Sequence, residues 1–316
     1  MRHAASRPSP AETITAAIVE RLEAGTRPWI QPWTGASVSR PLRACGTPYQ
    51  GINVLWLWMA AEAAGHASPF WMTYRQAQLL DGQVRKGERG TLAIFYRAYH
   101  IEEPDEDDEG TGARTHRVLK SFTVFNACQV DGLPTRFFPE PRPLPPATER
   151  NTALDRFFAA VPARIRHWGA EASYSPMLDQ VTMPEPGLFR DLDHYRATLA
   201  HELSHWTGHE SRLARQMGGR FGSDAYAMEE LVAELSSAML GAELGLPVEH
   251  LDHHASYLAS WLKVLKVDSG AILTVAAKAE EAASLFVFSS AAKKISHLHS
   301  SPAADLVYAM TNTPPS

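Results

Sequence analysis

The sequence predicts an α+β protein in which a mixed N-terminal domain is joined by a proline-rich linker to a mostly helical C-terminal domain. The chain has 316 residues, which is long enough for two ordinary domains. Residues 138–146 contain five prolines and should form a stiff, extended linker. Alternating, β-rich segments lie mainly before this linker, and long helical patterns follow it.

The N-terminal elements follow from apolar spacing and from their end signals. Ile14, Ile18 and Leu22 recur at helical spacing and Gly25 stops the pattern. Residues 91–99 and 118–129 alternate and should pair as strands, with the acidic block at 102–109 as their exposed loop. Residues 1–11 are expected to be disordered. Helices are predicted over residues 11–24, 53–64 and 73–80.

The C-terminal elements are mainly helical. A short β segment is expected at 172–183, and the tail after residue 298 is expected to be mobile. Helices are predicted from about residue 151, from about residue 193, and over residues 226–244, 251–265 and 271–286. The expected domains are residues 12–137 and 151–298, with a linker at 138–150 and a tail at 299–316.

Composition excludes several classes of protein. Apolar residues make up 45% and charged residues 21%, which are globular values. Cys45 and Cys128 cannot form a disulfide framework and belong to no metal-type pair, so a reducing compartment fits best. No apolar stretch of signal-peptide length follows the N-terminus, and the longest apolar run, residues 54–61, is too short to span a membrane. We expect a soluble, cytoplasmic protein with no membrane partner.

The net charge of −5 hides an asymmetry between the two halves. Residues 1–137 carry 15 Lys and Arg against 14 Asp and Glu, and seven of those acids lie in the block at 102–109. The rest of the chain carries 15 basic residues against 21 acidic ones. A locally basic N-terminal half fits an anionic partner, although such a surplus is also common on solvated surfaces.

The sequence His-Glu-Leu-Ser-His at residues 201–205 is the most specific chemical motif. His201 and His205 are four residues apart, so on a helix both imidazoles reach one cation. Glu202 then lies beside the metal with a carboxylate that can accept a proton from bound water. Leu199 and Leu203 supply an apolar stripe, which argues against an exposed polar helix with two incidental histidines.

A catalytic metal site needs a third protein ligand and an open position for water. The position that carries the third histidine in the long metzincin pattern is Ser211 here, and the direction of His209 is uncertain. Glu230 is the better candidate, because it shares a helix face with Glu234 and with small residues that allow close packing. Glu234 would then support a ligand histidine. Glu229 and Glu234 remain alternatives for the third ligand. A further alternative is that this acidic helix face is simply solvated and binds no metal.

These parts predict metal-assisted hydrolysis. Zn²⁺, or another divalent ion such as Mn²⁺, would lower the pKa of bound water toward about 7 while Glu202 takes the proton. Tyr226 and His254 are candidates to stabilise the oxyanion, and nothing in the spacing selects between them. The β segment before the motif can align an extended peptide with the site.

The N-terminal half combines basic and aromatic residues as single-stranded DNA sites do, with aromatic faces for the bases and cations for the phosphates. Trp56 and Trp58 belong to an apolar helix and are expected in the core, and other members can also pack inward. The candidate DNA-binding residues are Arg27, Trp29, Trp33, Arg40, Arg43, Tyr49, Trp71, Tyr74, Arg75 and Lys86, with Arg85 and Arg89 nearby.

The chain resembles the ArdC-type antirestriction proteins over about residues 12–290. The resemblance rests on residues 49–55 (YQGINVL), 71–77 (WMTYRQA), 84–90 (VRKGERG), 199–209 (LAHELSHWTGH), 212–213 (RL) and 229–235 (EELVAEL). It implies a plasmid-borne protein that protects incoming DNA from host restriction. It also implies an N-terminal single-stranded DNA-binding domain and a zincin-like metallopeptidase domain.

Two classes of function follow. The first is a metalloprotease that acts on a restriction enzyme or another DNA-bound protein. The second is a non-catalytic protein that binds and shields single-stranded DNA, or assists replication, with a structural or vestigial metal site. An intact Glu202 favours the first, because a structural site needs no general base.

Overall fold

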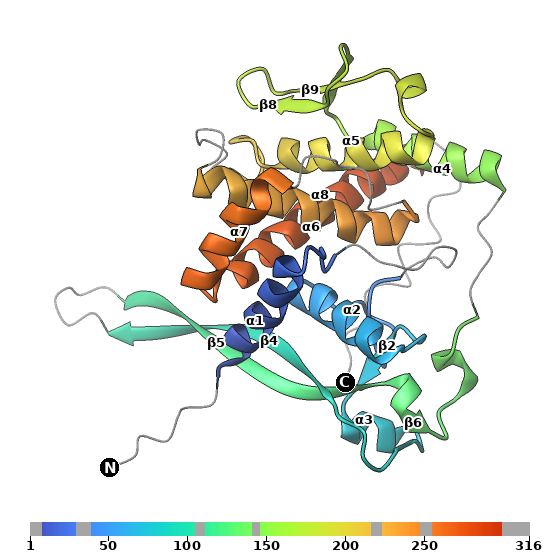
Figure 1. Ribbon diagram of the computed structural model, residues 1–316, viewed down its shortest axis with the longest axis vertical. Helices are drawn as coiled ribbons and strands as arrows, with labels where there is room; N and C mark the ends of the chain where they lie inside the picture. The colour runs from blue at the N-terminus through green and yellow to red at the C-terminus, as the bar shows by residue number, and fades with distance from the viewer. Residues whose placement is uncertain are drawn as a thin grey trace. The chain divides into compact units, whose positions relative to one another are not determined.

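The computed structural model describes residues 8–29, 39–104, 111–140, 146–215, 223–246 and 255–298. These residues form two compact units (Figure 1). Unit 1 comprises the described residues of Met1–Thr34, Val38–Pro141 and Leu258–Ala277. Unit 2 comprises those of Arg142–Tyr257 and Lys278–Ser316. The predicted α+β class is confirmed, with a mixed N-terminal part and a mostly helical C-terminal part.

The helices of unit 1 begin and end where local chemistry satisfies their backbone groups. Helix α1 (Pro10–Glu23) starts at a capping box between Ser9 and Glu12. Helix α2 (Ile52–Ala64) ends at Gly65, whose φ of 65° is the left-handed conformation that glycine adopts at low cost. Helix α3 (Tyr74–Leu79) starts at a second capping box, formed by Thr73 and Gln76. All three predicted N-terminal helices are present.

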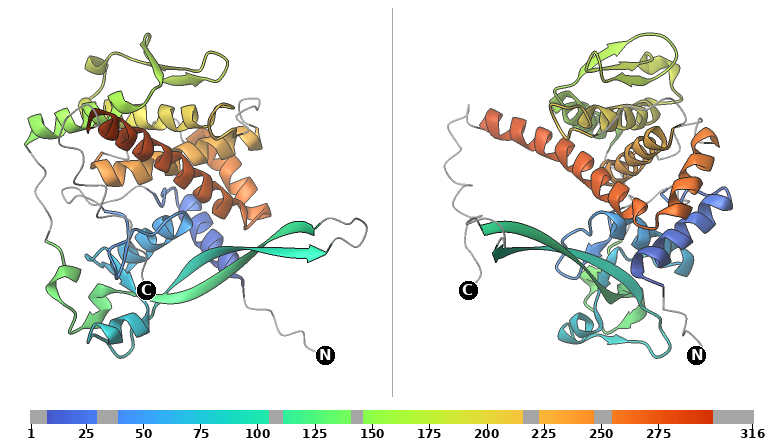
Figure 2. Two further views of the ribbon diagram at one scale, coloured as in Figure 1. Left: turned by 180° about the vertical axis from the view of Figure 1, so that it is seen from behind. Right: turned by 90° about the vertical axis from the view of Figure 1, so that its left-hand side faces the viewer.

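Unit 1 holds a four-stranded sheet in the order β1-β2-β5-β4. The predicted strand pair is the antiparallel hairpin of β4 and β5, which Figure 2 shows as a long curved ribbon. Residues 102–104 extend β4 instead of belonging to a loop, and Ala127–Gln129 form a 3-10 turn capped by Asn126 instead of strand. The strands are β1 (Leu42–Arg43), β2 (Phe70–Met72), β4 (Thr91–Pro104) and β5 (Thr111–Asn126), with β3 (Gln83–Val84) and β6 (Val130–Asp131) in a separate pair.

The core of unit 1 uses residues from distant parts of the chain. Leu57 of α2 packs with Trp71, Ala93 and Val124 of the sheet. Helix α7 (Ala255–Val267) contributes Trp261, which is fully buried and packs edge to face on Trp29 at 5.6 Å. This contact groups most of α7 with unit 1, although the sequence pattern alone suggested a C-terminal affiliation.

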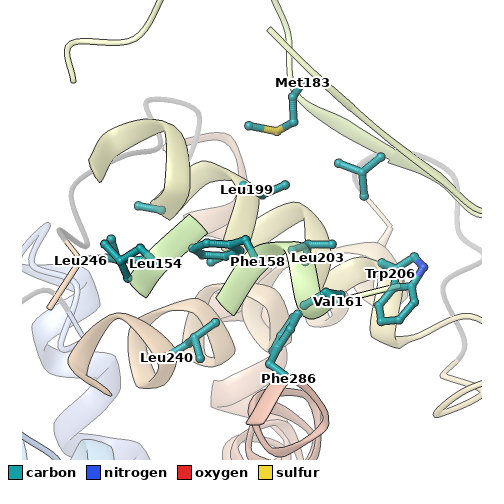
Figure 3. Close-up of a cluster of buried hydrophobic side chains, with 13 residues drawn as sticks. Leu154, Phe158, Val161, Met183, Leu199, Leu203, Trp206, Leu240, Leu246 and Phe286 are labelled. Carbon is teal, nitrogen blue, oxygen red and sulfur yellow. The ribbon is translucent and has the colours of Figure 1, made fainter. Parts of the chain in front are cut away.

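Unit 2 places helix α5 (Leu192–Thr207) between a small sheet and helix α6 (Asp224–Leu244) (Figure 1). The sheet has the order β7-β9-β8, so β8 lies at an edge. Figure 3 shows its core, in which Met183 of the sheet faces Leu199 and Leu203 of α5. The remaining elements are α4 (Ala147–Ala160), β7 (Arg164–His167), β8 (Ser173–Ser175), β9 (Gln180–Met183) and the long helix α8 (Ala271–Leu298).

Some boundaries differ from the predictions. Helix α1 begins at Pro10, inside the stretch 1–11 that was expected to be disordered, because the Ser9 cap satisfies its first backbone groups. Helix α4 begins at Ala147 instead of about 151, α8 continues twelve residues past 286, and strand β7 was not predicted. The predictions for residues 1–7, the acidic block at 105–110, the linker at 141–145 and the tail at 299–316 lie outside the described residues. Among the helices that the structure describes, none is long and apolar enough to cross a membrane.

Candidate metal centre

Helix α5 carries the two motif histidines on one face. Asp191 caps the helix by accepting a hydrogen bond from the backbone N–H of His194 at 2.9 Å. From Arg196 to Thr207 every residue is buried. The imidazoles of His201 and His205 lie one turn apart, and their Nε2 atoms are 3.2 Å from each other. The exposed polar helix considered above is therefore not what the chain forms.

Helix α6 brings Glu230 to the same point. One Glu230 oxygen lies 3.6 Å from Nε2 of His201 and the other lies 3.6 Å from Nε2 of His205. One ligand atom from each of the three buried residues falls within 4.8 Å of the others. Two imidazole nitrogens and one carboxylate oxygen are the donor set of many catalytic zinc sites, so these residues fit a divalent cation.

Each histidine also has a carboxylate beside its other ring nitrogen, Nδ1. Glu229 lies 3.3 Å from Nδ1 of His205, and Glu234 lies 3.6 Å from Nδ1 of His201. Such partners fix the tautomer and rotation of a ligand histidine. The structure thus places the Glu230 carboxylate next to the two Nε2 atoms that face each other, and it places Glu229 and Glu234 next to the Nδ1 atoms.

Arg215 holds Glu229 in place, and sequence reasoning missed it. Its guanidinium donates to both oxygens of Glu229, at 2.7 and 3.0 Å. It also donates to the hydroxyl of Thr207 and the carbonyl of Ser204, each at 2.7 Å. Nothing in the spacing identifies Arg215, because it reaches the centre from the segment between α5 and α6.

The electrostatics of this centre follow from burial and pairing. Burial disfavours a charged His205, but the carboxylates of Glu229 and Glu230 outweigh it and raise the pKa of His205 to about 10. Burial alone would raise the pKa of Glu230, but hydrogen bonds with His201 and His205 hold it below its usual range. A cation would take the place of the imidazolium proton, since a ligand imidazole must be neutral.

Glu202 lies beside the cluster in a different setting. It is buried, and this burial raises the pKa of its carboxyl group. The charges of His201 and His205 and a hydrogen bond from the Tyr174 backbone oppose the rise. Tyr174 belongs to β8, so an edge strand of the sheet lies next to the candidate general base.

Two tyrosines adjoin the carboxylates. Tyr226 lies one helical turn before Glu230, and its hydroxyl is 3.4 Å from that of Tyr257. Burial, then the Tyr257 hydrogen bond and the charge of Glu230, raise the pKa of Tyr226 well above its usual value. Of the two predicted oxyanion partners Tyr226 lies near the cluster, and His254 lies outside the described residues. No spacing signal pointed to Tyr257.

The segment after α5 holds His209, the other candidate ligand, in a contact outside the metal cluster. The helix ends at Thr207, and His209 turns to Ser211, with Nδ1 and Oγ 2.8 Å apart. Arg212 stacks on Trp206 at 3.9 Å and pairs with Asp179, which also accepts from the Tyr174 hydroxyl at 2.9 Å. These contacts fasten the β8–β9 turn to the end of the motif helix.

The DNA-binding candidates of unit 1 divide by exposure. Trp29 and Trp71 are each 1% exposed, so neither ring offers a face to a base, and both assignments are withdrawn. Tyr49 and Arg40 are also buried, Arg27 is half-buried, and Trp33 lies outside the described residues. Arg43 is exposed and stacks over Tyr49 at 5.5 Å. Exposed side chains remain at Tyr74, Arg75, Lys86, Arg85 and Arg89.

Comparison with known proteins identifies the family of this chain. The N-terminal domain of the anti-restriction factor ArdC matches residues 9–125, and the zincin-like metallopeptidase family matches residues 152–278. The crystal structure of metal-free antirestriction ArdC from plasmid R388 superposes with a TM-score of 0.76 at 40% identity, covering 90% of this chain and 99% of that one. The chain belongs to the ArdC antirestriction family.

Other members and relatives extend this result. The Mn(II)-bound structure of the R388 ArdC protein gives a TM-score of 0.74 at the same identity and coverage. The y4eC protein of Sinorhizobium fredii is 44% identical over 86% of this chain and 89% of its own length. A DNA primase TraC from Escherichia coli is 40% identical over 85% of this chain but only 26% of its own length. ArdC-type sequences therefore also occur as segments of larger proteins.

Proposed function

We propose that this ArdC-family chain binds single-stranded DNA and uses a divalent metal site to hydrolyse a peptide bond in a restriction enzyme or another DNA-bound protein. The observation that carries the peptidase part is the convergence of His201, His205 and Glu230 beside a buried Glu202. We expect the protein to act in the cytoplasm, where incoming plasmid DNA meets restriction.

The metal ligands are proposed to be His201, His205 and Glu230, with Zn²⁺ or Mn²⁺ as the cation. The Mn(II)-bound ArdC relative supports a divalent ion of this kind. When bound, such an ion polarises a carbonyl and lowers the pKa of its water toward about 7. Elemental analysis should find one metal per parent chain and none in a His201→Ala/His205→Ala double variant. Equal metal in both samples would remove the site.

The protein's own groups supply the rest of the chemistry. Glu202 is proposed to take a proton from the attacking water, because its buried carboxyl group lies beside the ligand cluster and burial raises its pKa. The hydroxyls of Tyr226 and Tyr257 can donate to the oxygen that becomes negative. Strand β8 ends the three-stranded sheet of the described residues, and its outer edge can offer backbone groups to an extended peptide, which would then pass next to Glu202.

The deciding variant is Glu202→Gln, with Glu210→Gln as the matched control at an exposed glutamate near the end of the same helix. Glu202→Gln should keep metal and DNA binding and lose both cleavage of a restriction enzyme and protection of DNA. Glu210→Gln should keep everything. If Glu202→Gln still protects DNA as well as the parent, proteolysis is not the mechanism.

A second candidate is a non-catalytic role in which the chain shields single-stranded DNA or assists replication. The match to part of the TraC primases favours it. Both candidates require the full chain to bind single-stranded DNA better than duplex, with affinity falling as salt rises. A preference for duplex at low salt would end both.

A further inference from the structure

A preformed pocket opens on the surface of unit 1, and the segments 71–77 and 84–90, which carry the family resemblance, contribute to its lining. It has a volume of about 660 Å³ and lies between α3, β3, β5 and β6. Tyr74 forms one wall, is 44% exposed, and packs edge to face on Phe125 at 6.4 Å. The lining residues are Tyr74, Gln83, Val84, Arg85, Lys86, Glu88, Phe125 and Asp131.

Arg85 connects the residues of the pocket floor through its hydrogen bonds. Its guanidinium donates to Glu88 at 2.7 Å, to Asp131 at 3.4 Å and to the carbonyl of Cys128 at 2.6 Å. Glu88 is held in turn by the Gln129 amide at 2.9 Å. A fixed floor means that little conformational freedom is lost when a ligand binds.

Glycines shape the turn that forms this floor. Gly87 has a φ of 92°, which a residue with a side chain rarely adopts. A Cβ at Gly90 would come within 2.2 Å of the Thr123 side chain and 3.0 Å of the Phe125 ring. The chain can therefore pass this close to Phe125 only with glycine at position 90.

Paired and unpaired charges lie at different places around the pocket. On the floor, Arg85 is offset by Glu88 and Asp131, so this part of the lining does not favour a phosphate. Lys86, which also lines the pocket, and Arg75 and Arg89, each next to a lining residue in the chain, are exposed and form no ion pair within the described part of the chain. An aromatic wall with neutralised charge, flanked by unpaired cations, is the arrangement that suits a base with its neighbouring phosphates.

We propose that this pocket holds one unstacked base of single-stranded DNA, stacked on Tyr74, with the adjacent phosphates on Lys86, Arg75 and Arg89. This inference rests on the proposed single-stranded DNA binding and locates it. Asp131 is 68% exposed at its side chain, and a carboxylate accepts from the exocyclic amino group of cytosine. Thymine has no such group. The pocket should therefore prefer dC to dT.

The stacking contact is tested in the full chain with a labelled dC oligonucleotide of about 16 nucleotides, followed by fluorescence anisotropy. Tyr74→Ala should lower affinity about tenfold, and Tyr74→Phe should retain it. Leu79→Ala, at an exposed position on the same helix but outside the pocket, is the matched control and should bind like the parent. An unchanged melting temperature in each variant shows that the fold is intact.

The base contact is tested by comparing dC with dT oligonucleotides. The parent should favour dC, and Asp131→Asn should remove most of that preference because an amide can pair with either base. A parent that binds both equally would overturn the Asp131 contact. If the parent binds DNA and Tyr74→Ala binds as well, the pocket is wrong while the proposed function stands. If the parent binds no single-stranded DNA, both fall together.

Discussion

Two arginine–glutamate pairs in this protein have the same contact distance and opposite surroundings. Arg215 and Glu229 in unit 2 approach to 2.7 Å with side chains only 3% and 7% exposed. Arg85 and Glu88 in unit 1 also approach to 2.7 Å, with side chains 44% and 25% exposed. Distance alone therefore says little about what a pair contributes. Access to water decides whether a charge that loses its partner can find another.

The buried pair belongs to a chain of compensating charges. Arg215 neutralises Glu229, Glu229 faces His205, and His205 faces Glu230. Each group also satisfies hydrogen bonds that water cannot reach, so removing one leaves the next exposed to an apolar interior. The pair of Arg212 and Asp179 lies between the two extremes, with side chains 14% and 35% exposed. Three matched perturbations can test this order.

The largest loss in the free energy of unfolding is expected from Arg215→Met. This change takes from the buried Glu229 the arginine that neutralises it. It also removes a donor to the Thr207 hydroxyl and to the Ser204 carbonyl, which keeps its hydrogen bond from Thr207 Oγ1 at 2.6 Å. Breaking a buried pair in this way costs about 3–5 kcal/mol. Urea unfolding of the metal-free protein measures it, with Arg85→Met as the matched change in the exposed pair. A loss as small as that of Arg85→Met would show that burial does not set the contribution.

Glu229→Gln is expected to have a smaller effect, and this effect is measured as a loss of metal affinity. From the sequence alone, Glu230 was the preferred third ligand and Glu229 a rival for the same position. The 3.3 Å contact between Glu229 and Nδ1 of His205 gives Glu229 a supporting role instead. Supporting carboxylates of this kind are worth about 10- to 100-fold in affinity, and a direct ligand more. In chelator competition, Glu230→Gln should have the lowest metal affinity, Glu229→Gln an intermediate one, and the exposed Glu210→Gln the highest.

If Glu229→Gln lowers metal affinity more than Glu230→Gln does, then Glu229 is the ligand and Glu230 the supporting carboxylate. The same ranking tests the link to Arg215, since Arg215→Met and Glu229→Gln should weaken metal binding by similar factors. Unequal factors would show that Arg215 acts on the fold and not through Glu229.

The sequence predicted the buried centre better than the exposed surface, and the reason is physical. The four-residue spacing of His201 and His205 fixes their common helix face, and the same rule brought Glu230 and Glu234 to one side of their helix. Arg215 and Tyr257 reach the centre from segments whose position no periodicity determines. Their roles depend on how the chain folds back, which a local pattern does not encode.

The aromatic residues of unit 1 show the opposite case. Composition supplied the right residue types for binding DNA but not their burial. Trp71 belongs to a three-residue strand, too short for alternation to show which face it occupies, and it points into the core. Trp29 is covered by Trp261, more than two hundred residues later. The helices of unit 1 were predictable because their caps and apolar spacing are local.

An intermediate effect is expected from Asp179→Asn, and it should depend on pH. Hydrogen bonds from Arg212, then from Tyr174, lower the pKa of Asp179 in the folded protein despite partial burial. A lowered pKa stabilises the fold above the unfolded pKa of about 3.9, and the stabilisation is lost as pH falls through the folded value. Asp179→Asn should therefore melt below the parent at neutral pH, and the gap should close only as pH falls below about 3.9 and through the lower pKa of the folded state. A gap that widens on acidification would contradict the pairing.

The smallest effect is expected from Arg85→Met. Glu88 is open to water and keeps its hydrogen bond from Gln129 at 2.9 Å, so it can be resolvated without its arginine. Exposed pairs of this kind contribute little because water and salt replace the partner. Urea unfolding should give the same midpoint as the parent, and added salt should not change the difference. DNA binding is the sharper readout, because Arg85 holds the floor of the pocket: affinity for single-stranded DNA should fall while the midpoint stays constant. A midpoint that falls as far as it does for Arg215→Met would mean that Arg85 stabilises unit 1 as a whole, and the contrast between the two pairs would then lie in something other than their access to water.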